Sequence, residues 1–118
     1  DTTAARRRFF PAEIAEQAAR RDTAPSEQEA PLKQQIAWGK QITSRSASAE
    51  SILALFAREG ERFSARNLST ASHRVAKIST TRVDWPLFER LAETCLHRLQ
   101  DFDSQALANT AWAFAKVL

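Results

Sequence analysis

Apolar residues recur at intervals of three and four along most of the chain after residue 31, as on one face of an α-helix. A first helical stretch opens at Pro31, which suits the start of a helix. The apolar positions of this stretch that recur at helical spacing are Leu32, Ile36 and Gly39, and Trp38 and Ile42 lie beside them.

The next two stretches carry clear boundary signals. Ser48 is suited to cap a second helix, with Glu50 favourable in its first turn and Gly60 as its stop. Ser64 caps a third helix that runs to about Ile78. The apolar positions are Ile52, Leu53, Leu55 and Phe56 in the second helix and Leu68, Ala71, Val75 and Ile78 in the third.

Two more helices follow. Asp84 caps a fourth, with Pro86 in its first turn, and Asp103 or Ser104 starts a fifth that is still running at Leu118. The core-facing residues of the fourth are Phe88, Leu91, Cys95, Leu96 and Leu99. In the fifth, Leu107, Ala111, Phe114 and Leu118 share one face, and Ala108, Trp112 and Ala115 make its flank apolar. We therefore expect an all-α fold of about five helices, with the last buried on two sides.

The third and fifth helices match at an offset of 39 residues. Phe63 aligns with Phe102, Leu68 with Leu107, and Ala76-Lys77 with Ala115-Lys116. The preceding helices align as well, with Ile52 against Leu91 and Phe56 against Cys95. A hairpin of this size hides little apolar surface alone, so the offset predicts stacked hairpins that form a short α-solenoid.

Domain organisation follows from this periodicity. Residues 1–30 are predicted to be a largely irregular tail and linker, broken by Pro25 and Pro31. Residues 31–118 are predicted to be the helical-repeat domain, about two units long and incomplete at its C-terminus, so that further repeats or a protein partner cover the last helix. The run Arg6–Arg8 is either a targeting remnant or a basic arm, and a solvated tail that docks through Phe9 and Phe10 is an equal alternative.

Charge and composition narrow the function classes. The net charge is +3 with a pI near 9.6. Residues 1–30 hold five arginines against six acidic residues, whereas residues 31–118 hold twelve basic residues against eight acidic ones. The basic excess therefore belongs to the helical part and suits an anionic partner. No stretch approaches the roughly 18 apolar residues of a membrane span.

The sequence offers no catalytic constellation. His73 and His97 lack a cysteine or carboxylate at ligand spacing, so no metal site and no cofactor are expected. Cys95 is the single cysteine and lies in an apolar run, where a buried thiol acts as a small hydrophobic residue. We expect a binding protein rather than an enzyme.

One face of the third helix is a candidate binding surface. Arg66, Thr70, His73 and Lys77 fall within about 60° of one another, and Arg74 flanks them. The matching residues of the fifth helix are Gln105, Asn109, Trp112 and Lys116. Readers of single-stranded RNA combine such polar, cationic and planar side chains. The alternative is an ordinary solvated face with Trp112 packed into the core against its neighbour.

These segments resemble a known family. Leu32–Ile36, Ile52–Phe56 and Phe63–Lys77 together look like one octotricopeptide-type unit, and Leu107–Lys116 looks like the next. The latter is also similar to FAST-kinase-like and RAP-associated repeats. The resemblance implies an α-solenoid of a plastid or mitochondrion that binds organellar RNA and assists its processing, stability or translation. A structural subunit of a large organellar assembly, using the same fold for protein contacts, is the alternative.

Overall fold

The computed structural model describes residues 28–79 and 83–117 of the 118-residue chain. Within these ranges it contains five α-helices and two short 3₁₀ turns, η1 and η2. Their bounds are α3 Leu32–Thr43, α4 Ala49–Glu59, η1 Gly60–Arg62, α5 Ala65–Ile78, α6 Trp85–His97, η2 Leu99–Asp101 and α7 Ser104–Val117. The predicted all-α class with about five helices is confirmed. The expectations for Arg6–Arg8, Phe9 and Phe10 lie outside the described residues.

The predicted N-terminal caps are present. The Ser48 hydroxyl accepts from the Ser51 backbone N–H at 3.0 Å, and the Ser51 hydroxyl accepts in return from the Ser48 N–H at 2.9 Å. Such a reciprocal pair satisfies two donors that a helix start leaves free. The other three caps consist of one hydrogen bond each. The side chains of Ser64, Asp84 and Asp103 accept from the backbone N–H groups of Asn67, Leu87 and Ala106, respectively.

Gly60 ends α4 as predicted, but for a different reason. Its φ of −58° is right-handed, so the left-handed glycine cap that commonly closes a helix does not form. A Cβ built on Gly60 would instead collide with the ring of Phe56. The glycine therefore allows η1 to turn tightly against this buried ring.

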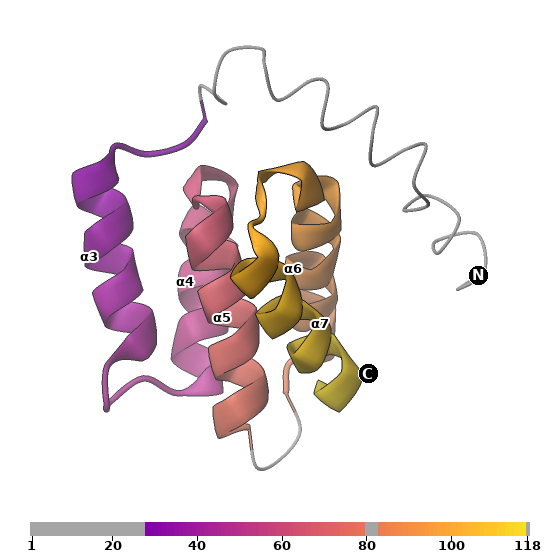
Figure 1. The fold of residues 1–118 in the computed structure, drawn as a ribbon. Coiled ribbons are helices and arrows are strands. Elements are labelled where there is room, and N and C mark those ends of the chain that lie inside the picture. The colour runs from indigo at the N-terminus through magenta and orange to yellow at the C-terminus, as the bar shows by residue number, and fades with distance from the viewer. Residues whose placement is uncertain (1–27, 80–82, 118) are drawn as a thin grey trace.

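Helix α5 is the centre of the fold (Figure 1). It contacts α3, α4, α6 and α7, and α4 also contacts α6. Its predicted stripe is buried: Leu68, Ala71 and Val75 are fully enclosed, and Ile78 packs against the same core. The rest of the core is contributed mainly by Trp38, Ile42, Ile52, Leu53, Leu55, Phe56, Phe63, Phe88, Leu91, Cys95 and Phe102. Solenoid stacking of hairpins stays a prediction.

The two flanking helices turn different faces inward from those predicted. In α3, Gln35, Trp38 and Ile42 are buried, whereas Leu32 and Ile36 are 75% and 52% exposed. The large Trp38 ring packs on Phe63, with ring centroids 5.2 Å apart, and this contact sets the rotation of the helix.

In α7 the predicted inward face is wrong by about one residue. Thr110 and Ala113 are buried and Phe114 is partly buried, but Leu107 is 41% exposed and Ala111 is exposed. Small residues face α5 because the two helices approach closely: the Ser69 hydroxyl donates to the Ala106 carbonyl at 3.0 Å. Leu118 lies outside the described residues.

The end of the linker is packed onto the helices. Ala30 is buried, and its N–H donates to the Arg62 carbonyl at 3.0 Å. Arg98 donates to the Glu29 carboxylate at 2.8 Å and to the Phe63 carbonyl at 2.8 Å. These contacts join residues 29 and 30 to both helical hairpins, α4–α5 and α6–α7.

No helix among the described residues has the length and apolar character needed to cross a bilayer.

Candidate nucleic-acid interface

The predicted face of α5 presents two exposed cations. Arg66 and Lys77 are exposed, and Thr70 and His73 lie half-buried between them. The Thr70 hydroxyl donates to the Arg66 carbonyl at 2.8 Å, which leaves its oxygen available only as an acceptor. No hydrogen bond of the described residues engages the guanidinium of Arg66 or the ammonium of Lys77, so both are available to an anion.

Arg74 has a different role from its neighbours. It is half-buried, and its Nη2 donates to the Ser44 carbonyl at 3.4 Å, while its Nε is enclosed with no acceptor among the described residues. The side chain therefore joins α5 to the segment after α3, and it does not extend the exposed row.

The matching face of α7 is polar at one end and cationic at the other. Gln105 and Lys116 are exposed and Asn109 is half-buried. The Gln105 amide donates to Asn109 Oδ1 at 3.1 Å. The Asn109 amide nitrogen makes no hydrogen bond with the described residues and remains a free donor.

The two faces meet at His73 and Trp112. Their ring centroids are 5.0 Å apart with the planes tilted by 43°, and Lys116 Nζ lies 5.3 Å from the Trp112 centroid. Trp112 is 46% exposed, so its interpretation as a buried core residue is wrong. Two rings and a cation are thus in contact with one another on the surface.

A groove between α5 and α7 adjoins this cluster. It has a volume of about 520 Å³ and is lined by Arg66 and Thr70 from α5 and by Gln105 and Asn109 from α7. Asp101 and Asp103 line the same groove. The carboxylates disfavour a phosphate in this groove, so the His73–Trp112–Lys116 cluster, which does not line it, is better suited to an anion.

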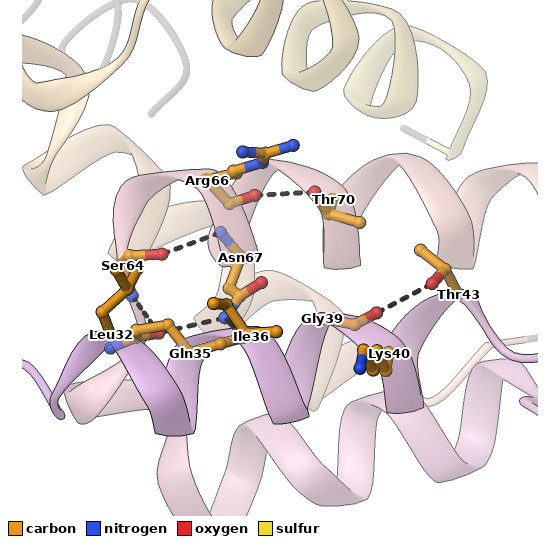
Figure 2. A pocket seen from close by; sticks show the side chains of 10 residues that line it. All are labelled: Leu32, Gln35, Ile36, Gly39, Lys40, Thr43, Ser64, Arg66, Asn67 and Thr70. Carbon is orange, nitrogen blue, oxygen red and sulfur yellow. Dashed lines mark hydrogen bonds between the residues drawn. The ribbon is translucent and has the colours of Figure 1, made fainter.

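A second groove, between α3 and α5, was not predicted (Figure 2). It also measures about 520 Å³, and Arg66 and Thr70 line it as well. Its other wall is the exposed side of α3, with Leu32, Ile36 and Gly39. The apolar spacing of these three residues is visible in the sequence, but it gave no sign that they face solvent.

Beneath this groove lies a buried amide network that sequence reasoning also missed. Gln35 Nε2 donates to the carbonyls of Ala30 and Arg62 at 3.1 and 2.6 Å. Gln35 Oε1 accepts from the Ser64 N–H at 2.9 Å and from Asn67 Nδ2 at 3.0 Å. The only sequence signal is the position of Gln35 one turn before Trp38 and two before Ile42, inside the buried stripe.

Reactive chemistry is not favoured by the surroundings of Cys95. The thiol is buried, and burial raises its pKa to about 11 against a weaker opposing effect of the Ser72 hydroxyl. A thiol of this kind is neutral and unreactive near pH 7. Within residues 28–79 and 83–117, no three histidine, cysteine or acidic side chains gather at a metal-binding spacing.

Comparison of the chain with protein families, curated proteins and solved structures finds no match.

Proposed function

We propose that this chain is a non-enzymatic helical-repeat module that binds single-stranded RNA. The observation that carries the proposal is the cluster of His73, Trp112 and Lys116, which joins two neighbouring helices at the surface. It supplies a planar stacking surface and a cation at one place, which is how proteins bind single strands with little dependence on sequence.

The neighbouring charges support the same function. Arg66 and Lys77 are exposed on α5 and lie on the same helix face as His73. Cations in such a row can follow a phosphate backbone while the rings contact bases. Contacts between alternate helices, α3 with α5, α4 with α6 and α5 with α7, are those that a solenoid would make. The resemblance to octotricopeptide-type repeats makes a plastid or mitochondrial transcript the target that we expect.

The test is binding of a labelled single-stranded RNA by the full chain across a series of salt concentrations. We expect the double variant Arg66→Ala, Lys77→Ala to lower the slope of log K against log salt by about 1.4, because each lost phosphate contact changes it by about 0.7.

The matched control is Arg58→Ala, Arg90→Ala, which removes the same charge from exposed positions on α4 and α6. The slope should then stay at its original value. A flat salt dependence in the unmodified chain, or an equal loss in both double variants, would contradict RNA binding by this face.

A structural subunit of a larger assembly is the second candidate. The exposed apolar side of α7 favours it, since Leu107 and Trp112 lie there among exposed alanines. This function predicts that the isolated chain self-associates and that Leu107→Lys makes it monodisperse in sedimentation. An RNA-binding module predicts a folded monomer without this change.

A further inference from the structure

The groove between α3 and α5 combines an apolar wall with a cationic rim. Leu32 and Ile36 stand one turn apart on α3 and are 75% and 52% exposed. The charged side chains that line the groove are Lys40 and Arg66, both cationic. In Figure 2, α3 and α5 run in the same direction, and Leu32 and Ile36 of α3 lie beside Asn67 of α5.

The floor of the groove carries a free hydrogen-bond acceptor. Asn67 is only 4% exposed, and its Nδ2 donates to the Gln35 carbonyl at 2.8 Å and to Gln35 Oε1 at 3.0 Å. Because Gln35 is itself held by its own hydrogen bonds, the orientation of the Asn67 amide is fixed. Asn67 Oδ1 lies on the opposite side of the amide (Figure 2), and no donor of the described residues reaches it. Asn67 Oδ1 is therefore an acceptor that a ligand entering the groove can reach with a donor of its own.

Gly39 keeps this acceptor accessible. A Cβ at position 39 would lie 3.2 Å from Asn67 Oδ1, closer than ordinary van der Waals contact. The missing side chain therefore leaves space directly over the oxygen. The intrinsic helix propensity of glycine is about 1 kcal/mol less favourable than that of alanine, but at position 39 glycine leaves the acceptor open.

We infer that the groove between α3 and α5 holds one nucleotide base of the bound RNA, with its face on Leu32 and Ile36 and an N–H of its edge donating to Asn67 Oδ1. The inference rests on the proposed function and adds a second contact site to it. Arg66 borders this groove and lies on the same face of α5 as His73, so one strand can contact both the groove and the His73–Trp112–Lys116 cluster.

The dimensions and charges favour a base over a peptide. A volume of about 520 Å³ lies within the range of small-ligand pockets. A docked amphipathic helix needs a longer series of apolar anchors than the two aliphatic side chains that α3 exposes here. The adjacent Lys40 and Arg66 complement the phosphates that flank a base.

The experiment compares a short labelled single-stranded RNA with an abasic strand of equal length. The full chain carries Leu32→Ala and Ile36→Ala, both at exposed positions where folding is retained. We expect RNA affinity to fall about tenfold, as for loss of one base contact, with no change for the abasic strand. The salt slope should also stay unchanged, because no charge is removed.

Gly39→Ala is a second variant, which places a methyl group 3.2 Å from Asn67 Oδ1 and covers the acceptor. It should weaken RNA binding and leave the abasic strand unaffected. The matched control for the leucine truncation in α3 is Leu107→Ala, which removes an exposed leucine of α7 outside this groove and should leave RNA affinity unchanged.

The outcomes separate the two proposals. Unchanged RNA affinity in the α3 variants, together with a steep salt slope in the unmodified chain, overturns the base site and leaves the proposed function standing. Equal losses for RNA and for the abasic strand overturn the base contact as well. A flat salt slope in the unmodified chain overturns the proposed function and the base site with it.

Discussion

The two hairpins, α4–α5 and α6–α7, place matching residues in opposite surroundings. Leu68 in α5 is fully buried, whereas Leu107, 39 positions later in α7, is 41% exposed. Ala76 is likewise buried and its match Ala115 exposed. Helix α5 has α3 on one flank and α7 on the other, but among the described residues α7 packs mainly on α5. Equivalent sequence positions thus acquire different energetic roles from their neighbours alone.

The largest expected effect tests this difference directly. Leu68→Ala should reduce the free energy of unfolding by about 2–5 kcal/mol, because it opens a cavity in the core. Leu107→Ala should change it by less than about 0.5 kcal/mol, as for an exposed position. Urea unfolding followed by circular dichroism measures both. Similar losses of unfolding free energy in the two variants would mean that Leu107 is as completely buried as Leu68.

The second prediction contrasts Cys95 of α6 with its match Phe56 of α4, which cannot ionise. Burial raises the pKa of the Cys95 thiol from 9.0 to about 11 in the folded chain. Below pH 9 the thiol is protonated in both states and its contribution to stability is fully present. Between pH 9 and 11 the unfolded chain releases the proton first, so the free energy of unfolding should fall by about 2–3 kcal/mol.

The measurement is urea unfolding at several pH values up to the folded pKa, for the unmodified chain and for Cys95→Ala. The variant starts from a lower stability, but its loss over this pH window should be smaller. If the free energy of unfolding fell equally with pH in the two proteins, the thiol would have the same pKa in the folded and in the unfolded chain.

The smallest effect concerns the two matching helix caps. Ser64→Ala and Asp103→Ala each remove an acceptor for a free N–H, at a cost of about 1 kcal/mol. At Ser64 we expect a loss of global stability, because α5 contacts α3, α4, α6 and α7. At Asp103 we expect faster hydrogen exchange mainly within α7. Equal exchange throughout the chain in both variants would remove the distinction between a central and a terminal helix.

Capping residues in the sequence predicted where the helices begin, because the start of a helix depends on residues close to it in the chain. Ser48, Ser64, Asp84 and Asp103 cap the helices that they were expected to begin. A cap requires only an oxygen three residues before a free N–H, and this is visible in the chain itself. Helix boundaries were therefore accessible without knowledge of the tertiary packing.

The rotation of the flanking helices was not accessible in the same way. In α3 the aliphatic Leu32 and Ile36 face solvent while the polar Gln35 is buried. Besides the Ala30 carbonyl, the partners that satisfy Gln35 lie about 30 residues away, such as Ser64 and Asn67. Such a network reverses the usual preference for burial, and the local sequence shows only that position 35 falls on the same stripe as Trp38 and Ile42.

The candidate site was predicted in part. Helical geometry placed His73 and Lys77 on one face, and the 39-residue offset paired His73 with Trp112. That the two rings touch depends on how α5 and α7 pack, and so does the exposure of Trp112. The groove beside α3 was missed because it exists only once the rotation of that helix is known.

The contacts of Arg98 have a consequence for folding kinetics. Its guanidinium bonds to Glu29 and to the Phe63 carbonyl, partners that lie 69 and 35 residues away in the chain. We expect contacts with such long sequence separations to form after both hairpins have docked, because closing long loops costs chain entropy. Interactions absent from the transition state slow unfolding without speeding folding. Arg98 is thus expected to lower the unfolding rate of the chain and to leave its folding rate unchanged.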